Sequence, residues 1–334
     1  MDLELLRERA KIIRNVRSFF NKRDYLETDT PLLAPTLIPE SCLEVFETRL
    51  FSPHGSRQSE KPYWLIPSPE IWMKRLIVQH RTNLYQICKC FRNGESSGRQ
   101  HSPEFTMLEY YSIEADYLDS LELTEELFRF LLDSKQVDSK QAGNFIDSGE
   151  LSPPFIIMTM EEAFHRWAGF DLYKAAKTQD AMEEEGRRLG LDPPAGLSVP
   201  ELYDLIFIHA VEPHLKMERP VALMDYPAFV PCLAKKSSDG KTTERWEVYA
   251  GGIELANCFS EETYGREVHR FFESEKAKKE KTALVRHNVD DTYWKIFQGA
   301  DIKISGVAMW LDRLIMLLCG RSTIDAVLPF PMES

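Results

Sequence analysis

A polar loop between two predicted strands has the residue types needed to bind a nucleotide. Arg92 ends the first strand, residues 93–102 form the loop, and the second strand begins near Phe105. A guanidinium offers a planar fork of donors to phosphate oxygens. Arg99 and His101 on the loop can reach the outer phosphates, and Phe105 can stack on a purine. One arginine at a strand end is usually structural, so the grouping is what indicates a nucleotide site.

Two glutamates that follow a pair of glycines are candidates for holding a metal ion. Glu254 lies in the strand predicted over residues 253–259, and Glu261 follows it seven positions later. Carboxylates near a triphosphate are best explained by Mg²⁺, which prefers oxygen ligands and bridges phosphate oxygens. The alternative is two exposed acids at a strand end, which is a serious alternative in a chain with 53 acidic residues.

Arg313 lies near the start of an apolar segment, residues 307–318, whose spacing predicts a helix. Burying a guanidinium is costly when it has no partner. We therefore expect Arg313 to bind an anion or to pair with an internal acid. Asp312 precedes it, and the two look like a buried pair.

A fourth group combines acids with a serine and a tyrosine. Ser68 and Glu70 flank the proline at which a helix is predicted to begin. Glu109 and Tyr111 lie two positions apart on a predicted strand, so their side chains share one face. Several carboxylates that converge on one pocket would select a small dicationic ligand such as lysine.

The apolar pattern predicts the elements that must position these groups. Helical spacing predicts helices over residues 3–20, 70–80, 121–132 and 267–281, and residues 171–218 look helical with a break at Pro193 and Pro194. Alternation predicts strands over residues 44–51, 83–92, 105–113, 245–250 and 253–259. Thr159 and Glu162 form a capping-box signature for a further helix. This order is typical of an α+β fold, an antiparallel sheet flanked by helices. We expect one domain over residues 1–334, with a helical insertion at about residues 115–220.

Composition narrows the class of protein. With 334 residues, 43% of them hydrophobic, the chain has enough apolar material for a core. The formal net charge of −12 argues against a dedicated nucleic-acid-binding protein, although a local basic patch is still allowed. The N-terminus lacks the apolar region of a secretory signal, and no apolar run is long enough to span a bilayer. We expect a cytoplasmic protein with no membrane partner.

Several segments resemble the class II aminoacyl-tRNA synthetases of the lysine, aspartate and asparagine subgroup. Residues 91–111, which end in GRQHSPEFTMLEYY, resemble motif 2. Residues 306–317, GVAMWLDRLIML, resemble motif 3, and the first helix, ending near Pro31, resembles motif 1. SPEIWMKRL (68–76) and GIELANCFSE (252–261) resemble blocks specific to lysyl enzymes. The resemblance runs from about residue 8 to 331.

The layout resembles the short paralogues within that family, the elongation factor P (R)-β-lysine ligases. Lysyl-tRNA synthetases carry an N-terminal anticodon-binding OB domain, and we expect none here because the motif 1 helix begins almost at Met1. Ala308 agrees, since the ligases have alanine where the synthetases have glycine. The resemblance implies lysine or β-lysine as substrate, elongation factor P as acceptor, and a homodimer formed through motif 1. It makes tRNA an unlikely partner.

The resemblance also implies roles for individual residues. Arg92 and Arg313 are the expected catalytic residues, which hold the α- and γ-phosphates of ATP. The expected nucleotide-binding residues are Arg92, Asn93, Glu95, Arg99, His101, Ser102, Phe105, Glu254, Leu255 and Arg313. The expected amino-acid-binding residues are Ser68, Pro69, Glu70, Glu109, Tyr111, Glu261 and Ala308. Glu254 and Glu261 are the expected Mg²⁺ ligands. The family reaction forms an acyl-adenylate and then transfers the acyl group, and it needs no protein nucleophile.

The sequence departs from the family pattern around the expected nucleotide. Gly94 takes the place of the motif 2 glutamate, Glu95 follows one position late, and Ser102 replaces an asparagine. Trp310 replaces a glycine beside the nucleotide, where an indole could fill the space that ATP needs. Cys258 also replaces a glycine, and we expect it to add bulk next to the pocket.

Three hypotheses remain open at this point. The first is an active ligase of the β-lysine type, with the indole of Trp310 turned aside. The second is a non-catalytic paralogue whose blocked site binds an amino acid or a partner protein. The third is an ordinary aminoacyl-tRNA synthetase, which the absence of an anticodon-binding domain and the acidic charge make the least favoured.

Overall fold

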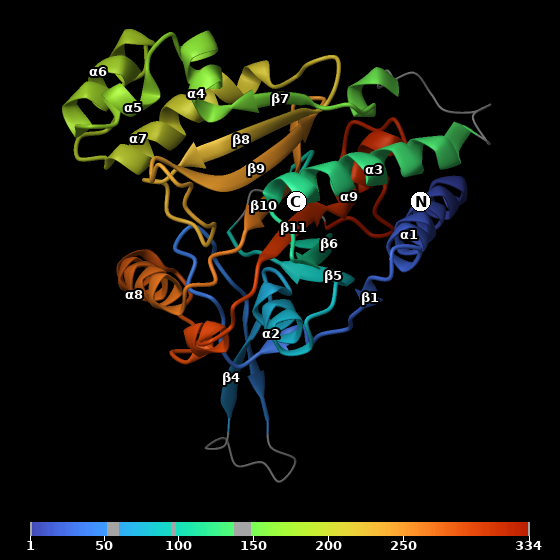
Figure 1. Ribbon diagram of the computed structural model, residues 1–334. Helices are drawn as coiled ribbons and strands as arrows, with labels where there is room; N and C mark the ends of the chain where they lie inside the picture. Colours follow the sequence, from blue (N-terminus) through green and yellow to red (C-terminus); the bar gives the residue numbers. More distant parts are fainter. Residues whose placement is uncertain (1, 52–59, 95–97, 137–147, 333–334) are drawn as a thin grey trace.

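An eight-stranded sheet forms the centre of the computed structural model, which describes residues 2–51, 60–94, 98–136 and 148–332 (Figure 1). The strands lie in the order β1 (Leu26–Glu27), β5 (Leu84–Phe91), β6 (Glu104–Ile113), β11 (Ile304–Trp310), β10 (Ile253–Ser260), β9 (Thr242–Ala250), β8 (Val221–Pro227) and β7 (Ile156–Thr159). The pairs from β5 to β8 are antiparallel, and only the two edge strands, β1 and β7, pair in parallel with their neighbours. The predicted α+β class is confirmed.

A second sheet of three strands lies at one end of the molecule. It has the order β2 (Leu33–Ala34), β4 (Lys61–Leu65) and β3 (Glu47–Leu50). Figure 1 shows it projecting away from the large sheet. The helices are α1 (Leu3–Asn21), α2 (Glu70–His80), α3 (Tyr117–Gln136), α4 (Met160–Ala163), α5 (Leu172–Ala175), α6 (Gln179–Arg188), α7 (Val199–Ile206), α8 (Gly265–Thr282) and α9 (Leu311–Leu318). No helix of the described residues is long and apolar enough to cross a membrane.

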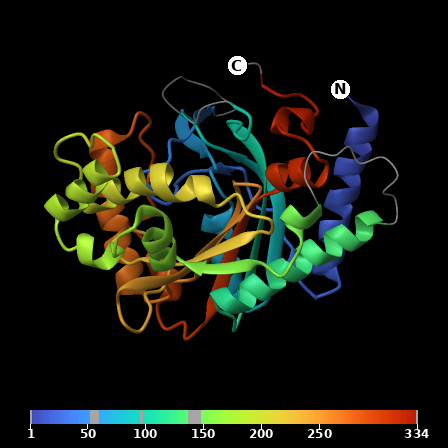
Figure 2. The same ribbon diagram turned by 90° about the horizontal axis from the view of Figure 1, so that it is seen from above.

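One face of the large sheet is apolar and forms the main core. Alternate residues of neighbouring strands, such as Tyr110 of β6, Met309 of β11 and Cys258 of β10, pack there with buried side chains of α1, α3 and α9. Helices α1 and α3 contact each other on this side (Figure 2). The opposite face is therefore available for polar groups, and strand alternation directs them to it.

The helical region predicted over residues 115–220 divides between two cores. Helix α3 packs on α1 and on β10 and β11, so it belongs to the main core. Helices α4–α7 have a separate apolar core against β7 and β8, over which Figure 1 shows them gathered. The predicted capping box of Thr159 and Glu162 starts α4 and is confirmed.

The predicted helix over residues 307–318 is wrong in its first four residues. Residues up to Trp310 form β11, which lies between β6 and β10, and α9 begins only at Leu311. A strand that is buried on both faces is continuously apolar, so its pattern cannot be told from that of a buried helix. Asp312 and Arg313 are both buried, as expected; Asp312 pairs with Arg9 of α1 at 2.6 Å, and Arg313 lies 3.4 Å from the carboxylate of Glu254.

The buried pair of Arg9 and Asp312 joins the first and last helices. Replacing Arg9 with methionine should lower the free energy of unfolding by about 3–5 kcal/mol, because Asp312 would remain as a buried charge with no cation beside it. Chemical denaturation measures this difference. The matched control is Arg17→Met on the same helix, whose pair with Glu27 is exposed, for which we expect about 1 kcal/mol or less. Equal losses in the two variants would contradict the prediction.

Candidate active site

One row of residues crosses five strands on the face of the sheet opposite the main core. The strand registers pair Gln86 with Glu109, Glu109 with Ala308, Ala308 with Asn257, and Asn257 with Glu247. Directly opposed residues in antiparallel strands point to the same face. The acids at positions 109 and 247 therefore share one polar surface, although they are 138 positions apart in the chain.

Glu109 is the centre of an acidic cluster at one end of this row. Its carboxylate accepts hydrogen bonds from the hydroxyls of Tyr111 at 2.6 Å and Ser68 at 2.7 Å. Burial and the nearby charge of Glu70 raise the pKa of Glu109 to about 8, against the lowering effect of the two hydroxyl groups. The structure thus brings together the serine, the tyrosine and the acids that the sequence nominated.

Lys74 is the cation of the acidic cluster, and the sequence analysis missed it. Its ammonium group lies 2.5 Å from Glu70 and 2.6 Å from Glu261, and only 2% of the side chain is exposed. Burial disfavours the charged form of Lys74, but the carboxylates of Glu261 and Glu70 offset this and hold its pKa well above the ordinary value. Burial raises the pKa of Glu261 to about 7, with Lys74 opposing that rise. The i, i+4 spacing of Glu70 and Lys74 was the available signal.

The two nominated arginines converge on one indole ring at the other end of the face. The guanidinium carbon of Arg92 lies 4.8 Å from the ring centroid of Trp310, and that of Arg313 lies 4.0 Å from it. Arg313 also donates to the carbonyls of Glu254 at 2.8 Å and Gln100 at 3.1 Å. The two guanidiniums, one directly after β5 and one in α9, therefore lie against the same aromatic side chain.

Glu254 and Glu261 cannot share a metal ion, so that expectation is corrected. They stand at opposite ends of β10, and seven residues of strand separate them by roughly 20 Å. Glu261 belongs to the acidic cluster with Lys74. Glu254 lies instead near Glu247 of β9: burial raises the pKa of Glu254, and the charge of Glu247 raises it further. Glu247 is a second residue that the sequence analysis missed.

The carboxylates of Glu247 and Glu254 suit a hard divalent cation. Burial and the charge of Glu247 disfavour ionisation of Glu254, and a cation held by oxygen ligands relieves such repulsion. Glu247 already accepts from Arg245 at 2.5 Å and from Tyr249 at 2.8 Å. No group of three or more acids, histidines or cysteines arranged for a metal is found in the described residues. Oxygens of a bound phosphate would add to the coordination of a cation held by these two carboxylates.

Comparison with known proteins identifies the family. The family model described as tRNA synthetases class II (D, K and N) matches residues 3–334. The chain belongs to this family. Two relatives, from Avibacterium paragallinarum and Proteus mirabilis (strain HI4320), are named elongation factor P–(R)-β-lysine ligase, and each is 34% identical to this chain. The matches cover 99% and 98% of this chain and 96% and 94% of the relatives.

The start of the motif 2 loop of this class II synthetase is anchored on a neighbouring segment. The side-chain amide of Asn93 donates to the carbonyl of Val45 at 3.3 Å, and its backbone bridges to Glu44. Gly94, in the place of the family's glutamate, has φ = +73°, a conformation that strains residues with a side chain. Glu95, the suggested substitute, lies outside the described residues.

The remaining nominated residues of the synthetase lie in several settings. Ser102 is buried, Arg99 is exposed on the loop, and Arg313 contacts His101. Pro69 is the N-cap residue of α2. Three of these residues lie in the motif 2 loop, and Pro69 lies at the start of α2, next to Glu70.

Two residues of β10 point away from the site. The side chains of Leu255 and Cys258 are buried in the main core, on the opposite face of the sheet. The expectation that Cys258 adds bulk next to the pocket is therefore wrong, and the side chain of Leu255 cannot line the nucleotide site. The bulge between Glu254 and Ala256 shifts the alternation at this point, which a strict period of two does not reveal.

Glu40 lies between the two clusters of this synthetase and was also missed. Burial raises its pKa to about 7; the charge of Glu70 adds to that rise, and the charge of Arg92 opposes it. The carbonyl of Glu40 accepts from Lys279 of α8 at 2.9 Å, which fixes the segment that carries it. No motif in the local sequence distinguishes this glutamate from a surface acid.

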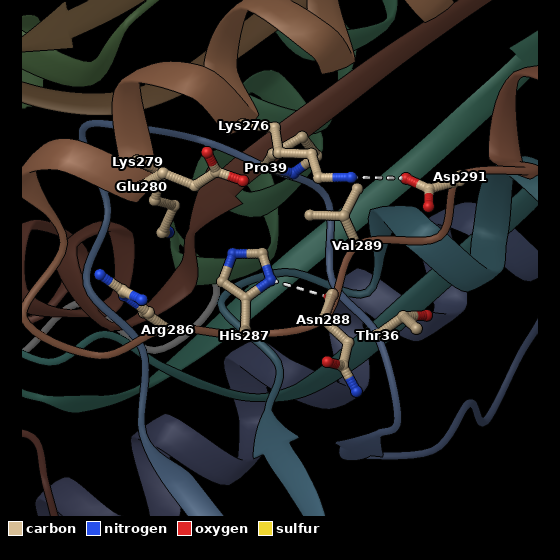
Figure 3. A pocket seen from close by; sticks show the side chains of 10 residues that line it. All are labelled: Thr36, Pro39, Lys276, Lys279, Glu280, Arg286, His287, Asn288, Val289 and Asp291. Carbon is tan, nitrogen blue, oxygen red and sulfur yellow. Dashed lines mark hydrogen bonds and ion pairs between the residues drawn. The ribbon is translucent and has the colours of Figure 1, made fainter.

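A pocket of about 700 Å³ lies on the α8 side of this segment, lined by Lys279, Arg286 and His287 among others (Figure 3). Burial lowers the pKa of His287 to about 4, so its ring is neutral at pH 7. Its lining contains none of the residues of the acidic cluster or of the two guanidiniums. The chemistry expected of a class II synthetase is therefore not located there.

Proposed function

We propose that this class II synthetase activates lysine or β-lysine with ATP and transfers the acyl group to a lysine side chain of elongation factor P. The acidic cluster is the observation that carries the proposal. Glu70, Glu109 and Glu261 provide three carboxyl groups, and Lys74 supplies one internal cation. A ligand with two ammonium groups would balance the remaining charge, because buried charges require partners.

The guanidiniums of Arg92 and Arg313 support the nucleotide half of the reaction. In the first step the carboxylate of the substrate attacks the α-phosphorus of ATP, the acyl-adenylate forms, and pyrophosphate leaves. Fixed positive groups stabilise the charge that develops on the phosphate, and binding in one cleft aligns the reacting atoms. In the second step the amine of the acceptor attacks the carbonyl carbon, AMP leaves, and the amine loses a proton. Neither step requires a nucleophile from this chain.

Glu254 and Glu247 are the residues that we propose hold Mg²⁺ when it accompanies ATP. The ion would neutralise charge on the phosphate oxygens. The position of Glu254 supports this assignment, because Arg313 lies 3.4 Å from its carboxylate and its backbone carbonyl accepts from the same guanidinium. Glu254 therefore orients Arg313 toward the nucleotide site whether or not the ion is bound.

The test is ATP–pyrophosphate exchange with lysine, (R)-β-lysine and uncharged amino acids of similar length. We expect exchange with at least one dicationic amino acid and none with the uncharged analogues. Mass spectrometry of elongation factor P after incubation should show addition of the same acyl group, and a parallel reaction with tRNA should show no charging. Absence of exchange with every amino acid would overturn the proposal.

A second candidate function is suggested by the packing of Trp310 against Phe105. A synthetase paralogue whose nucleotide site stays closed would bind a dicationic amino acid without activating it. Calorimetry distinguishes the two candidates: lysine binding with no binding of Mg·ATP would favour this one, and binding of both would exclude it.

We also propose that the protein is a cytoplasmic homodimer. Four large apolar side chains are each 45% exposed or more in the single chain: Leu26 on the edge strand β1, Leu33 and Leu50 in the small sheet, and Phe51 after it. A second copy of the chain would cover these side chains. Light scattering should give twice the chain mass of 38.7 kDa, and a monomer at micromolar concentration would contradict this.

A further inference from the structure

The indole of Trp310 lies against the aromatic side chain that the proposed function assigns to the nucleotide base. The ring centroids of Trp310 and Phe105 are 4.3 Å apart with an angle of 35° between the planes. Trp310 is the last residue of β11, and its partner in the register is Met107 of β6. Because Phe105 is two positions before Met107, it shares that face of the sheet, and the backbone itself places the two rings together.

The contacts of the indole resemble those that a purine ring would make. Phe105 packs on it, and the guanidiniums of Arg313 and Arg92 approach it at 4.0 and 4.8 Å, within the range of cation–π interactions. Trp310 is 6% exposed and Phe105 is 1% exposed. While the indole is in this position, the ring of Phe105 has no exposed face on which a base could stack.

Arg313, which would meet a phosphate, lies against the indole at 4.0 Å but also has anchors outside this aromatic stack. Arg313 is held by carbonyls of Glu254 and Gln100, neither of which depends on the indole. Arg99 is exposed on the loop, where its carbonyl accepts from the backbone of Ile324 at 2.9 Å. The indole therefore opposes binding of the base more than it opposes binding of the triphosphate.

We propose that Trp310 competes with the nucleotide base for the face of Phe105, so that it sets the affinity of this enzyme for ATP and its selectivity for the base. This inference rests on the nucleotide site of the proposed function. ATP binds by displacing the indole, and each binding event loses the stacking and cation–π contacts that the indole makes. Ligands that present only phosphates avoid this loss.

The test compares the affinities of the parent and of position-310 variants for two ligands, one with a base and one without. Trp310→Gly and Trp310→Ala should each bind Mg·ATP about tenfold more tightly than the parent, because the lost contacts correspond to a stacked pair with a cation–π interaction. Their affinity for Mg·tripolyphosphate, which has no base, should remain within about twofold. Equilibrium dialysis gives both constants, and thermal denaturation with two independent variants confirms that the protein is folded.

The matched control is Trp167→Phe. The indole of Trp167 stacks on His214, with 5.5 Å between the ring centroids, and it packs against the separate core of the helical region. This variant should change neither affinity. ATP affinity that is unchanged or weaker in both position-310 variants would overturn the proposal, as would an equal gain for tripolyphosphate.

Affinity measurements and pyrophosphate exchange test the role of Trp310 and the ligase activity separately. If the variants gain ATP affinity but no amino acid supports pyrophosphate exchange, competition by Trp310 stands and the ligase activity is excluded. If exchange occurs with lysine or β-lysine while the variants show no gain, the ligase stands and the role of Trp310 is excluded. A lower KM for ATP at nearly constant kcat in Trp310→Gly would support both.

Discussion

Replacing Arg92 with lysine should slow ATP–pyrophosphate exchange by about a hundredfold or more. The ammonium group keeps the charge but loses the planar fork that binds two phosphate oxygens at once. The backbone amide of Arg92 donates to the carbonyl of Pro103 at 3.0 Å, so the chain is fixed at this position and cannot shift to compensate. Initial rates at saturating lysine, together with thermal denaturation, measure the effect.

The matched control for this variant is Arg270→Lys. Arg270 is exposed on α8 and pairs with Glu267 on the same helix, so its replacement should leave the exchange rate unchanged. If Arg92→Lys retains more than about a third of the parent rate, the residue does not stabilise the transition state by a bidentate contact. The assignment of the α-phosphate to this guanidinium would then be withdrawn.

The main features of the fold could be predicted because long periodic segments specify their own structure. Helix α1 begins at Leu3, where the expected helix begins, and α2 has the expected bounds of residues 70 and 80. Strands β5 and β6 lie within one residue of their predicted ends. Residues 307–310 were assigned to a helix because β11 is covered on both faces, a property of the tertiary structure that one sequence does not reveal.

The site was predictable where residue types alone indicated the ligand, and not where only the fold shows which residues lie close together. Ser68, Glu70, Glu109 and Tyr111 form one cluster, as their residue types suggested. Lys74 was overlooked because a lysine on a helix is usually solvated, and its burial becomes evident only from the position of Glu261. Grouping Glu254 with Glu261 failed because seven residues of strand separate them by far more than two side chains can span.

The carboxyl groups of the acidic cluster carry more negative charge than Lys74 can balance. Burial and this negative charge together raise the pKa values of Glu109 and Glu261. Burial and the charge of Glu70 raise the pKa of Glu109 to about 8, and burial raises that of Glu261 to about 7. Both glutamates therefore bind protons at a pH where exposed glutamates are ionised. For Glu109 the folded state binds more protons than the unfolded state between pH 4.5 and 8, so its contribution to stability is present below pH 4.5 and is lost as the pH rises through 8.

A dicationic ligand should reverse this protonation, so lysine or β-lysine should bind more tightly as the pH rises from 6 to 8. An ammonium group beside Glu109 favours its ionised form, and binding below pH 8 must therefore release a proton. Each released proton makes the affinity rise about tenfold per pH unit. The rise should end above pH 8, where Glu109 is already ionised, and the side-chain ammonium of the ligand stays charged to about pH 10.

Calorimetry at several pH values, in pairs of buffers with different ionisation enthalpies, measures both the affinity and the number of protons released. Glu109→Gln should bind more weakly, and its pH dependence between pH 7 and 8 should be smaller than that of the parent, because an amide does not titrate and the remaining dependence comes from Glu261, whose pKa is about 7. Glu104→Gln, on the same strand but exposed beside Lys89, should keep the parent slope. A parent affinity that is independent of pH over this range would mean that Glu109 does not change protonation on binding, and a dication would then not be the ligand that this cluster selects.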